Sequence, residues 1–209
     1  MSDVKNNQGL VRRRGRPPAF DRREVLERAA KIFWRRGYEG ASIVDLTDAM
    51  GITAQSLYAA FGSKAQLYRE ALDWYRAALG AITPEALDAP DAIAVLSALL
   101  RDQARAFTDP AYPPGCMIAT AALGCAEEND PVSAMVADLR HASVALVRAR
   151  LERAIVEGDL RPDADPVALA RFVGAVIQGL SVQARDGAGA DELVAVAELA
   201  AMELARHRA

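Results

Sequence analysis

The stretch SIVDLTDAMGITAQSLYAAF, residues 42–61, decides the fold of this chain, because it predicts two short helices joined by a tight turn. Ser42 followed by Asp45 has the spacing of a capping box, which marks the start of a helix. Gly51 suits the position just past a helix end, where a left-handed backbone is costly for a residue with a side chain. Thr53 is placed to cap the second helix. The apolar residues that set the buried faces recur at helical spacing: Ile43, Leu46, Met50, Ile52, Leu57 and Phe61.

The outer face of the second helix indicates its partner. Gln55 and Ala59 lie opposite Leu57, with Ala54 and Tyr58 beside them. This face is small and polar and carries no acidic residue, so it can enter a major groove without repelling phosphates. Two helices joined by a short glycine-containing turn are typical of the DNA-binding helix-turn-helix, and an ordinary helical hairpin is the alternative.

Gln55 is the candidate base-reading residue, because an amide can make a bidentate pair with adenine. The alternative is an exposed glutamine that contacts only phosphate or water. Ala54 and Ala59 are candidates for contact with thymine methyl groups. Their alternative role is simply small size, which permits close approach.

The distribution of charge separates the chain into two parts. The chain has 209 residues, 52% hydrophobic and 25% charged, enough for one or two domains with a core. Residues 1–64 hold 12 Lys/Arg and 7 Asp/Glu, a net charge of +5, whereas the remainder carries −8. A basic amino-terminal third joined to an acidic remainder is the asymmetry expected of a DNA-binding head on a body with another task.

Residues 1–20 are polar, basic and interrupted by Gly15, Pro17 and Pro18, so we expect a flexible arm. Within it, Arg14 and Arg16 are expected to lie along phosphates or in a minor groove, where arginine is electrostatically favoured. The alternative is a solvated tail.

The chain is expected to be cytoplasmic and reduced. It has no apolar run of about 18 residues that would span a membrane. No hydrophobic segment follows the polar amino terminus, so a signal peptide is not expected. Cys116 and Cys125 alone do not make a disulfide framework.

The remaining periodicity predicts an all-α fold with about nine helices and no strand. The other expected helices span about 21–36, 63–81, 91–107, 116–127, 132–157, 166–185 and 191–208. We therefore divide the chain into the arm 1–20, a head 21–81 that includes a connecting helix, and an effector-binding and dimerisation body 82–209.

The expected helix 166–185 is apolar on most sides, so it must be covered on two faces. A second copy of the chain is the simplest cover, and it would form a four-helix interface with the last helix. The residues expected in this interface are Ala170, Val173, Gly174, Val176, Ile177, Leu193, Val196, Ala200 and Leu204.

An effector site is expected between the helices of the body, in a mostly apolar cavity with a few polar groups. Polar residues that interrupt apolar stripes are the candidates, with larger apolar residues as walls; the alternative is that backbone groups satisfy each polar side chain. The candidates are Gln103, Thr120, Ser143 and Gln178, with Phe107, Met117 and Phe172 as walls. No cluster of buried charge is expected, which favours a largely neutral, apolar effector.

No catalytic arrangement is recognisable in the sequence. Cys116 and Cys125 are nine residues apart, so on one helix they would point to opposite faces and could not share a metal. No cofactor is expected. An enzyme or small-molecule carrier with an accessory helix-turn-helix is therefore the weaker alternative to a regulator.

Several motifs, in order, resemble the TetR/AcrR family of bacterial transcriptional regulators. They are Gly15-Arg16-Pro17-Pro18, Ala30-x-x-Phe33-x-x-x-Gly37-Tyr38, the stretch 42–61, and Phe61-Gly62-Ser63-Lys64-x-x-Leu67-Tyr68. The resemblance is close over about residues 15–72. Beyond it, the segments 114–117 and 178–187 are similar to a subset of the family.

The resemblance implies a homodimer whose two heads bind a palindromic DNA operator, usually as a repressor, with a pocket for a small-molecule effector in each body. It implies that Tyr58 and Lys64 contact phosphates, and that Ser42 and Thr53 face the DNA backbone at helix starts. Many members carry an aromatic or histidine pair where this chain has Ala59-Ala60. That departure leaves the base-reading set open.

Overall fold

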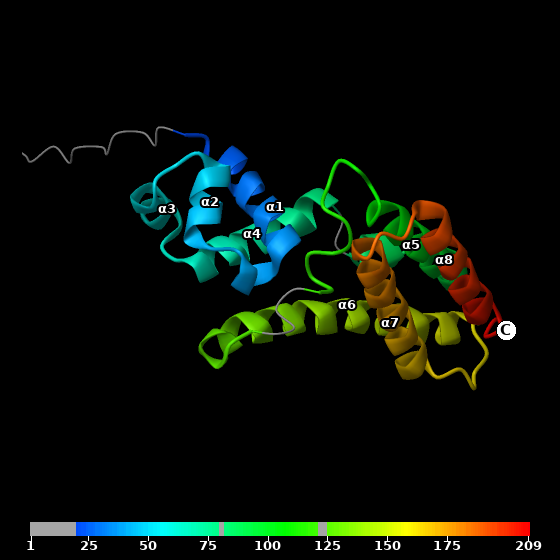
Figure 1. Cartoon of the computed structure of the whole chain (residues 1–209). Helices are drawn as coiled ribbons and strands as arrows, with labels where there is room; N and C mark the ends of the chain where they lie inside the picture. Colours follow the sequence, from blue (N-terminus) through cyan, green and yellow to red (C-terminus); the bar gives the residue numbers. More distant parts are fainter. Residues whose placement is uncertain (1–19, 80–81, 121–124) are drawn as a thin grey trace, which may run out of the picture.

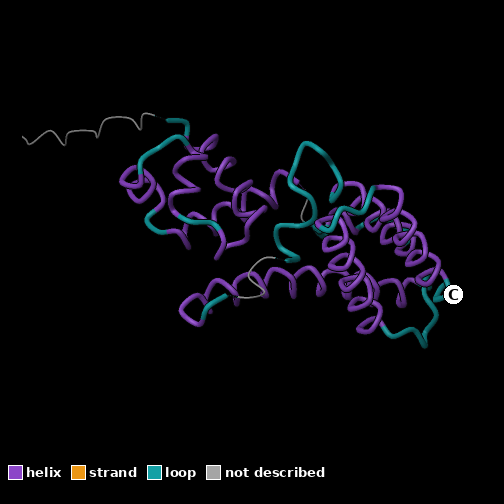
Figure 2. The backbone as a smooth tube through the Cα atoms, viewed as in Figure 1, coloured by secondary structure: helices purple, strands orange, loops and turns teal. Residues whose placement is uncertain are grey.

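The computed structural model describes residues 20–79, 82–120 and 125–209. These residues form eight α-helices and two short 3-10 helices, and no strand occurs among them (Figures 1 and 2). The all-α prediction is confirmed. The elements are α1 Arg22–Gly40, α2 Ile43–Met50, α3 Ala54–Phe61, α4 Lys64–Leu79, η1 Glu85–Leu87, α5 Ala92–Ala106, η2 Glu127–Asn129, α6 Asp130–Glu157, α7 Pro166–Arg185 and α8 Ala190–Ala205.

The predicted caps of the head are confirmed. The Ser42 hydroxyl accepts a hydrogen bond from the Asp45 amide at 3.1 Å, and the Asp45 carboxylate accepts one from the Ser42 amide at 3.1 Å. Gly51 ends α2 in the left-handed region with φ 68°. Thr53 accepts from the Ser56 amide at 3.1 Å and so starts α3. These local bonds set where α2 begins and ends and where α3 begins.

Gly37 interrupts α1, as the sequence predicts. Its backbone has φ 72° and ψ 178°, so the helix breaks there and resumes for a short turn up to Gly40. The carbonyl groups just before the break belong to a helix end and lack some of their helical partners.

The helix expected over about 116–127 is wrong for the described residues 116–120, 125 and 126, which are not helical, and residues 121–124 lie outside the described part of the chain. Residues 116–120 form turns, and only η2 is helical near the end of this segment. Tertiary contacts hold both ends of this segment. The Cys116 amide donates to the Ser181 hydroxyl at 2.7 Å, and the Ala126 amide donates to the Glu39 carboxylate at 3.0 Å.

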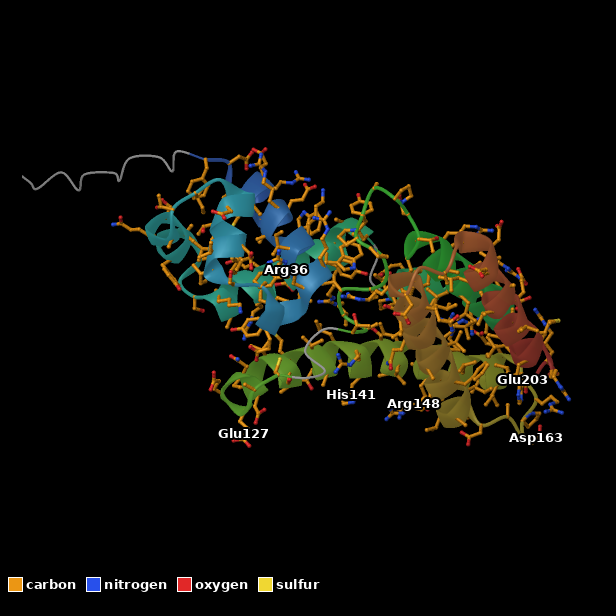
Figure 3. All side chains as sticks on the ribbon, in the orientation of Figure 1. Arg36, Glu127, His141, Arg148, Asp163 and Glu203 are labelled. Atoms are coloured by element: carbon orange, nitrogen blue, oxygen red, sulfur yellow. The ribbon has the colours of Figure 1, made fainter. Side chains whose placement is uncertain are left out.

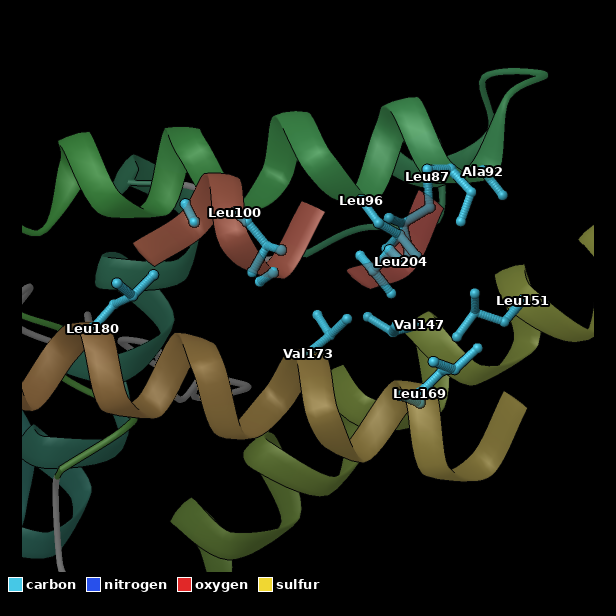
Figure 4. Packing of buried hydrophobic residues seen from close by; sticks show 14 of the residues in the cluster. Leu87, Ala92, Leu96, Leu100, Val147, Leu151, Leu169, Val173, Leu180 and Leu204 are labelled. Carbon is cyan, nitrogen blue, oxygen red and sulfur yellow. The ribbon is translucent and has the colours of Figure 1, made fainter. Parts of the chain in front are cut away.

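Two apolar cores organise the molecule. In the body, α5 packs against α8 and α6 packs against α7 around Leu96, Leu151 and Val173 (Figure 4). In the head, α1 to α4 enclose a second core, which Met117, Val132 and Val136 join. The amino-terminal half of the long helix α6 therefore runs along the head (Figure 1), and the two halves of the chain share packed side chains. Together with α4, this packing positions the head on the body.

One described helix, α7, has the length and composition of a membrane span, with mean hydropathy 1.4 over 18 residues. Core helices of soluble proteins have the same composition, and α7 packs against α5, α6 and α8.

Candidate nucleic-acid interface and effector cavity

The outer face of α3 is exposed as the sequence predicts. Ala54, Gln55, Tyr58 and Ala59 are exposed, and Tyr58 has 47% of its surface accessible. On the opposite side of the helix, Leu57 is fully buried in the head core. The turn and the caps thus present a short helix whose free face carries an amide, a phenol and two methyl groups. No carboxylate lies on this face.

The helix starts beside α3 are also accessible. Ser42 and Thr53 are exposed, although both hydroxyls already cap their helices. Val44 on α2 is also exposed, with 65% of its surface accessible, and the sequence analysis did not single it out.

Lys64 has a more enclosed position than the sequence predicts. It is the first residue of α4, and its ammonium lies 4.4 Å from the centre of the Tyr38 ring. Burial lowers the pKa of Lys64, whereas the nearby Glu39 raises it. The charge therefore lies at the start of α4 against an aromatic face. Arg14 and Arg16 are outside the described residues, so their predicted contacts with DNA stay predictions.

An ion pair joins α1 to α2. Arg36 (labelled in Figure 3) lies 2.5 Å from the Asp45 carboxylate. The Ser42 hydroxyl is the largest cause that lowers the pKa of Asp45 to about 2, and Arg36 adds to it. Asp45 is therefore ionised at neutral pH, and it holds both the capping box and the α1–α2 contact.

The body contains a cavity of about 110 Å³ between α4, α5, α6, α7 and the segment 116–119. Three predicted ligand residues, Gln103, Ser143 and Gln178, line it. The Ser143 hydroxyl donates to the Leu139 carbonyl at 3.1 Å, so α6 itself satisfies it. The amides of Gln103 and Gln178 have no hydrogen-bond partner among residues 20–79, 82–120 and 125–209.

The other four predicted ligand residues are not at this cavity. Met117 and Thr120 line a separate hollow beside Trp34. Phe107 is buried in the body core, and Phe172 is packed against that core. The effector role of these four residues stays a prediction, because helical spacing identifies an inward face without saying which void that face meets.

Sequence reasoning missed several cavity residues. Tyr75 of α4 donates its hydroxyl hydrogen to the Cys116 sulfur at 3.3 Å, and burial raises the pKa of Tyr75. Arg140 donates to the Ile118 carbonyl at 3.1 Å. Arg76 completes the polar part of the lining. These residues come from separate segments, so no local pattern could have joined them.

The predicted dimer residues differ in exposure, and their role stays a prediction. Five of them are buried inside the protomer: Ala170, Val173, Leu193, Ala200 and Leu204. Gly174, Val176, Ile177 and Val196 are only partly accessible, and Gly174 and Ile177 line the cavity. The large apolar residues that α7 and α8 expose near their carboxyl ends are Val182, Leu199 and Met202, with 45%, 63% and 59% of their surfaces accessible. A helix that is apolar on two faces does not reveal from its sequence which face turns inward.

Comparisons with known proteins agree with this arrangement. Residues 25–71 match the family described as bacterial regulatory proteins, tetR family, and residues 92–204 match the tetracyclin repressor-like C-terminal domain. The chain is 32% identical over 201 residues to the HTH-type transcriptional repressor ComR of Escherichia coli (strain K12), with 92% of each chain covered. It is 28% identical over 194 residues to the repressor BdcR of the same organism, with 89% of this chain and 90% of BdcR covered.

Among solved structures, a cysteine mutant of the TetR family regulator CifR, complexed with 26-base-pair double-strand operator DNA, superimposes with a TM-score of 0.86. The two chains are 45% identical, with 90% of this chain and 98% of the CifR chain covered. The capped helix-turn-helix, the exposed α3 face and these matches lead to one conclusion. This chain belongs to the TetR family of bacterial regulatory proteins and is a DNA-binding transcriptional repressor.

Proposed function

We propose that the chain acts in the cytoplasm as a homodimer that binds a palindromic operator and releases it when a small molecule enters the body cavity. The observation that carries this proposal is the α3 face. It is exposed, lacks acidic residues and belongs to a helix-turn-helix in which both helix starts are capped. In a dimer, two such faces must be separated by about 34–36 Å or a multiple of it to enter successive major grooves of B-DNA.

We assign base reading to Gln55, with Ala54 and Ala59 at close approach, and phosphate contact to Tyr58 and Lys64. Gln55 has the only amide on the α3 face, and its side chain is exposed. Tyr58 carries a hydroxyl that can donate to a phosphate oxygen. The arm, with Arg14 and Arg16, would add contacts that do not depend on sequence. We retain the division into arm 1–20, head 21–81 and body 82–209 for these tasks.

We assign effector binding to the cavity beside Gln103 and Gln178. Its lining is mostly apolar, and the two amides offer donors and acceptors without a partner in the described part of the chain. A small, largely apolar molecule with a hydroxyl or carbonyl group fits this lining. For the dimer, we assign the contact to the outward faces of α7 and α8 around Val182, Leu199 and Met202.

We propose no enzymatic activity for this chain. The named relatives are transcriptional repressors. Among the described residues, no group of three or more His, Cys, Asp and Glu side chains is arranged to hold a metal ion.

The proposal is tested by selecting bound sequences from a random duplex library with the full-length protein at physiological salt. We expect a palindrome to emerge. The variant Gln55→Ala should change the preferred base at one position of each half-site, by roughly the 1–3 kcal/mol of a lost bidentate contact. Tyr58→Phe is the control, because losing a phosphate contact should weaken binding to all sequences equally. Failure of the wild type to enrich any sequence would refute the proposed function.

A further inference from the structure

The carboxyl end of the first α1 segment is held by the body through a charged side chain. Arg185, the last residue of α7, donates from its guanidinium to the carbonyl oxygens of Trp34 and Arg35, both at 3.0 Å. These carbonyls lie three and two positions before the break at Gly37. A cation at a helix carboxyl end is favourable, because the exposed carbonyls carry the negative end of the helix dipole.

A second contact joins the same part of α1 to the loop that follows α5. The Trp34 indole N–H donates to the Gly115 carbonyl at 3.1 Å and is buried. Gly115 itself lies directly on α7, because a Cβ at this position would be 2.6 Å from the Ser181 carbonyl oxygen. The next residue, Cys116, donates its amide to the Ser181 hydroxyl at 2.7 Å. Helix α7, the loop and α1 therefore form one packed connection.

This connection reaches the cavity along a single face of α7. Gln178 lines the cavity, Ser181 holds the loop, and Arg185 holds α1. Residues at i, i+3 and i+7 share one side of a helix, and seven residues span about 10 Å. Cys116 also lines the cavity. A ligand that displaces the Gln178 side of α7 or the loop must therefore act on the contact between Arg185 and the head.

We propose that Arg185 is a positioning residue for operator binding, which sets the orientation of the head relative to the body through the end of α1. This inference rests on the proposed function. It gives the head a second connection to the body, besides the covalent connection through α4. Two heads that keep a fixed orientation bind both half-sites without an ordering cost. Heads that move independently of the body lose that advantage.

The head stays attached when Arg185 is replaced, because other contacts remain. The Glu39 carboxylate accepts from the Ala126 amide at 3.0 Å and from the Asn129 side-chain amide at 2.8 Å. Met117 and Val136 are packed into the head core. Replacement of Arg185 therefore changes the orientation of the head and leaves its fold intact.

The experiment compares a full palindrome, selected with the wild type, with a duplex that carries only one half-site. Affinities are measured by fluorescence anisotropy with full-length protein. For Arg185→Gln we expect about tenfold weaker binding to the full palindrome and less than about a twofold change on the half-site, because only the palindrome engages both heads. Ser181→Ala, which removes the bond to the loop, should show the same selectivity with a smaller effect.

Arg148→Gln is the matched control. Arg148 is an exposed arginine of α6 in an i,i+4 ion pair with Glu152. Its replacement by glutamine removes the same positive charge at a site far from the head (Figure 3). It should leave both affinities unchanged. An equal loss on palindrome and half-site for Arg185→Gln, or no loss on the palindrome, would overturn the inference. If the wild type selects no sequence, the proposed function fails instead, so the two failures are distinguishable.

Discussion

Replacement of Gly115 by alanine should destabilise the protein more than the same replacement at another left-handed glycine. Gly115 has φ 76°, and its Cβ would meet the Ser181 carbonyl oxygen at 2.6 Å and the Arg185 Cγ at 2.9 Å. Gly158, which ends α6, has φ 83° and nothing within 4 Å of the same position. The pair therefore separates the cost of backbone strain from the cost of lost close approach.

The magnitudes follow from these two terms. The left-handed backbone should cost each alanine variant about 1–2 kcal/mol. At Gly115 the carbonyl of a packed helix cannot move away cheaply, so an overpacking term of about 1–3 kcal/mol is added. We expect Gly158→Ala to lose about 1–2 kcal/mol and Gly115→Ala about 2–5 kcal/mol of unfolding free energy.

The assay is urea denaturation followed by circular dichroism at one fixed protein concentration, because the stability of a dimer depends on concentration. Equal slopes of unfolding free energy against urea would show that both variants unfold from comparable states. If the two variants lose the same free energy, the contact between Gly115 and α7 is not tight, and the reasoning is refuted. Gly115→Ala should also weaken binding to a full palindrome, because it pushes the loop away from α7.

Three further results are expected. Arg150→Met should lower the free energy of unfolding, measured by urea denaturation, by about 2–4 kcal/mol. The buried Arg150 guanidinium donates to the Ala89 and Pro90 carbonyls at 2.9 and 2.7 Å, and the variant leaves both carbonyls without this donor. A loss below about 0.5 kcal/mol would contradict this. The pKa of Asp45 is lowered from 3.8 to about 2 in the folded head, so its ionised form stabilises the head above pH 4. That stabilisation should disappear as the pH falls from about 4 towards 2, and acid titration of Asp45→Asn should lack this component; an unchanged acid transition would count against it. Leu199→Glu should give a monomer in sedimentation at micromolar concentration, because it places a charge on an apolar surface that is 63% accessible; a persistent dimer would place the interface elsewhere.

The local parts of the fold could be predicted because their determinants lie within a few residues of one another. The Ser42–Asp45 box, the left-handed Gly51 and the Thr53 cap each depend on neighbours at most four positions away. The same is true of α7, whose start is set by the Asp165 side chain that caps it. Periodicity therefore identified the exposed face of α3, and the predicted α7 has the bounds that the structure shows.

Only the tertiary structure determined which face of each helix is buried and which segments far apart in the sequence are in contact. Helix α7 is apolar on two sides, and only packing against α5 and α6 determined that Val173 turns inward while Val182 stays accessible. The segment 116–120, expected to be helical, forms turns, and its Cys116 amide donates to the Ser181 hydroxyl 65 positions away. Arg185 finds the Trp34 carbonyl 151 positions away. Such contacts depend on how whole helices pack, and no spacing within the sequence encodes them.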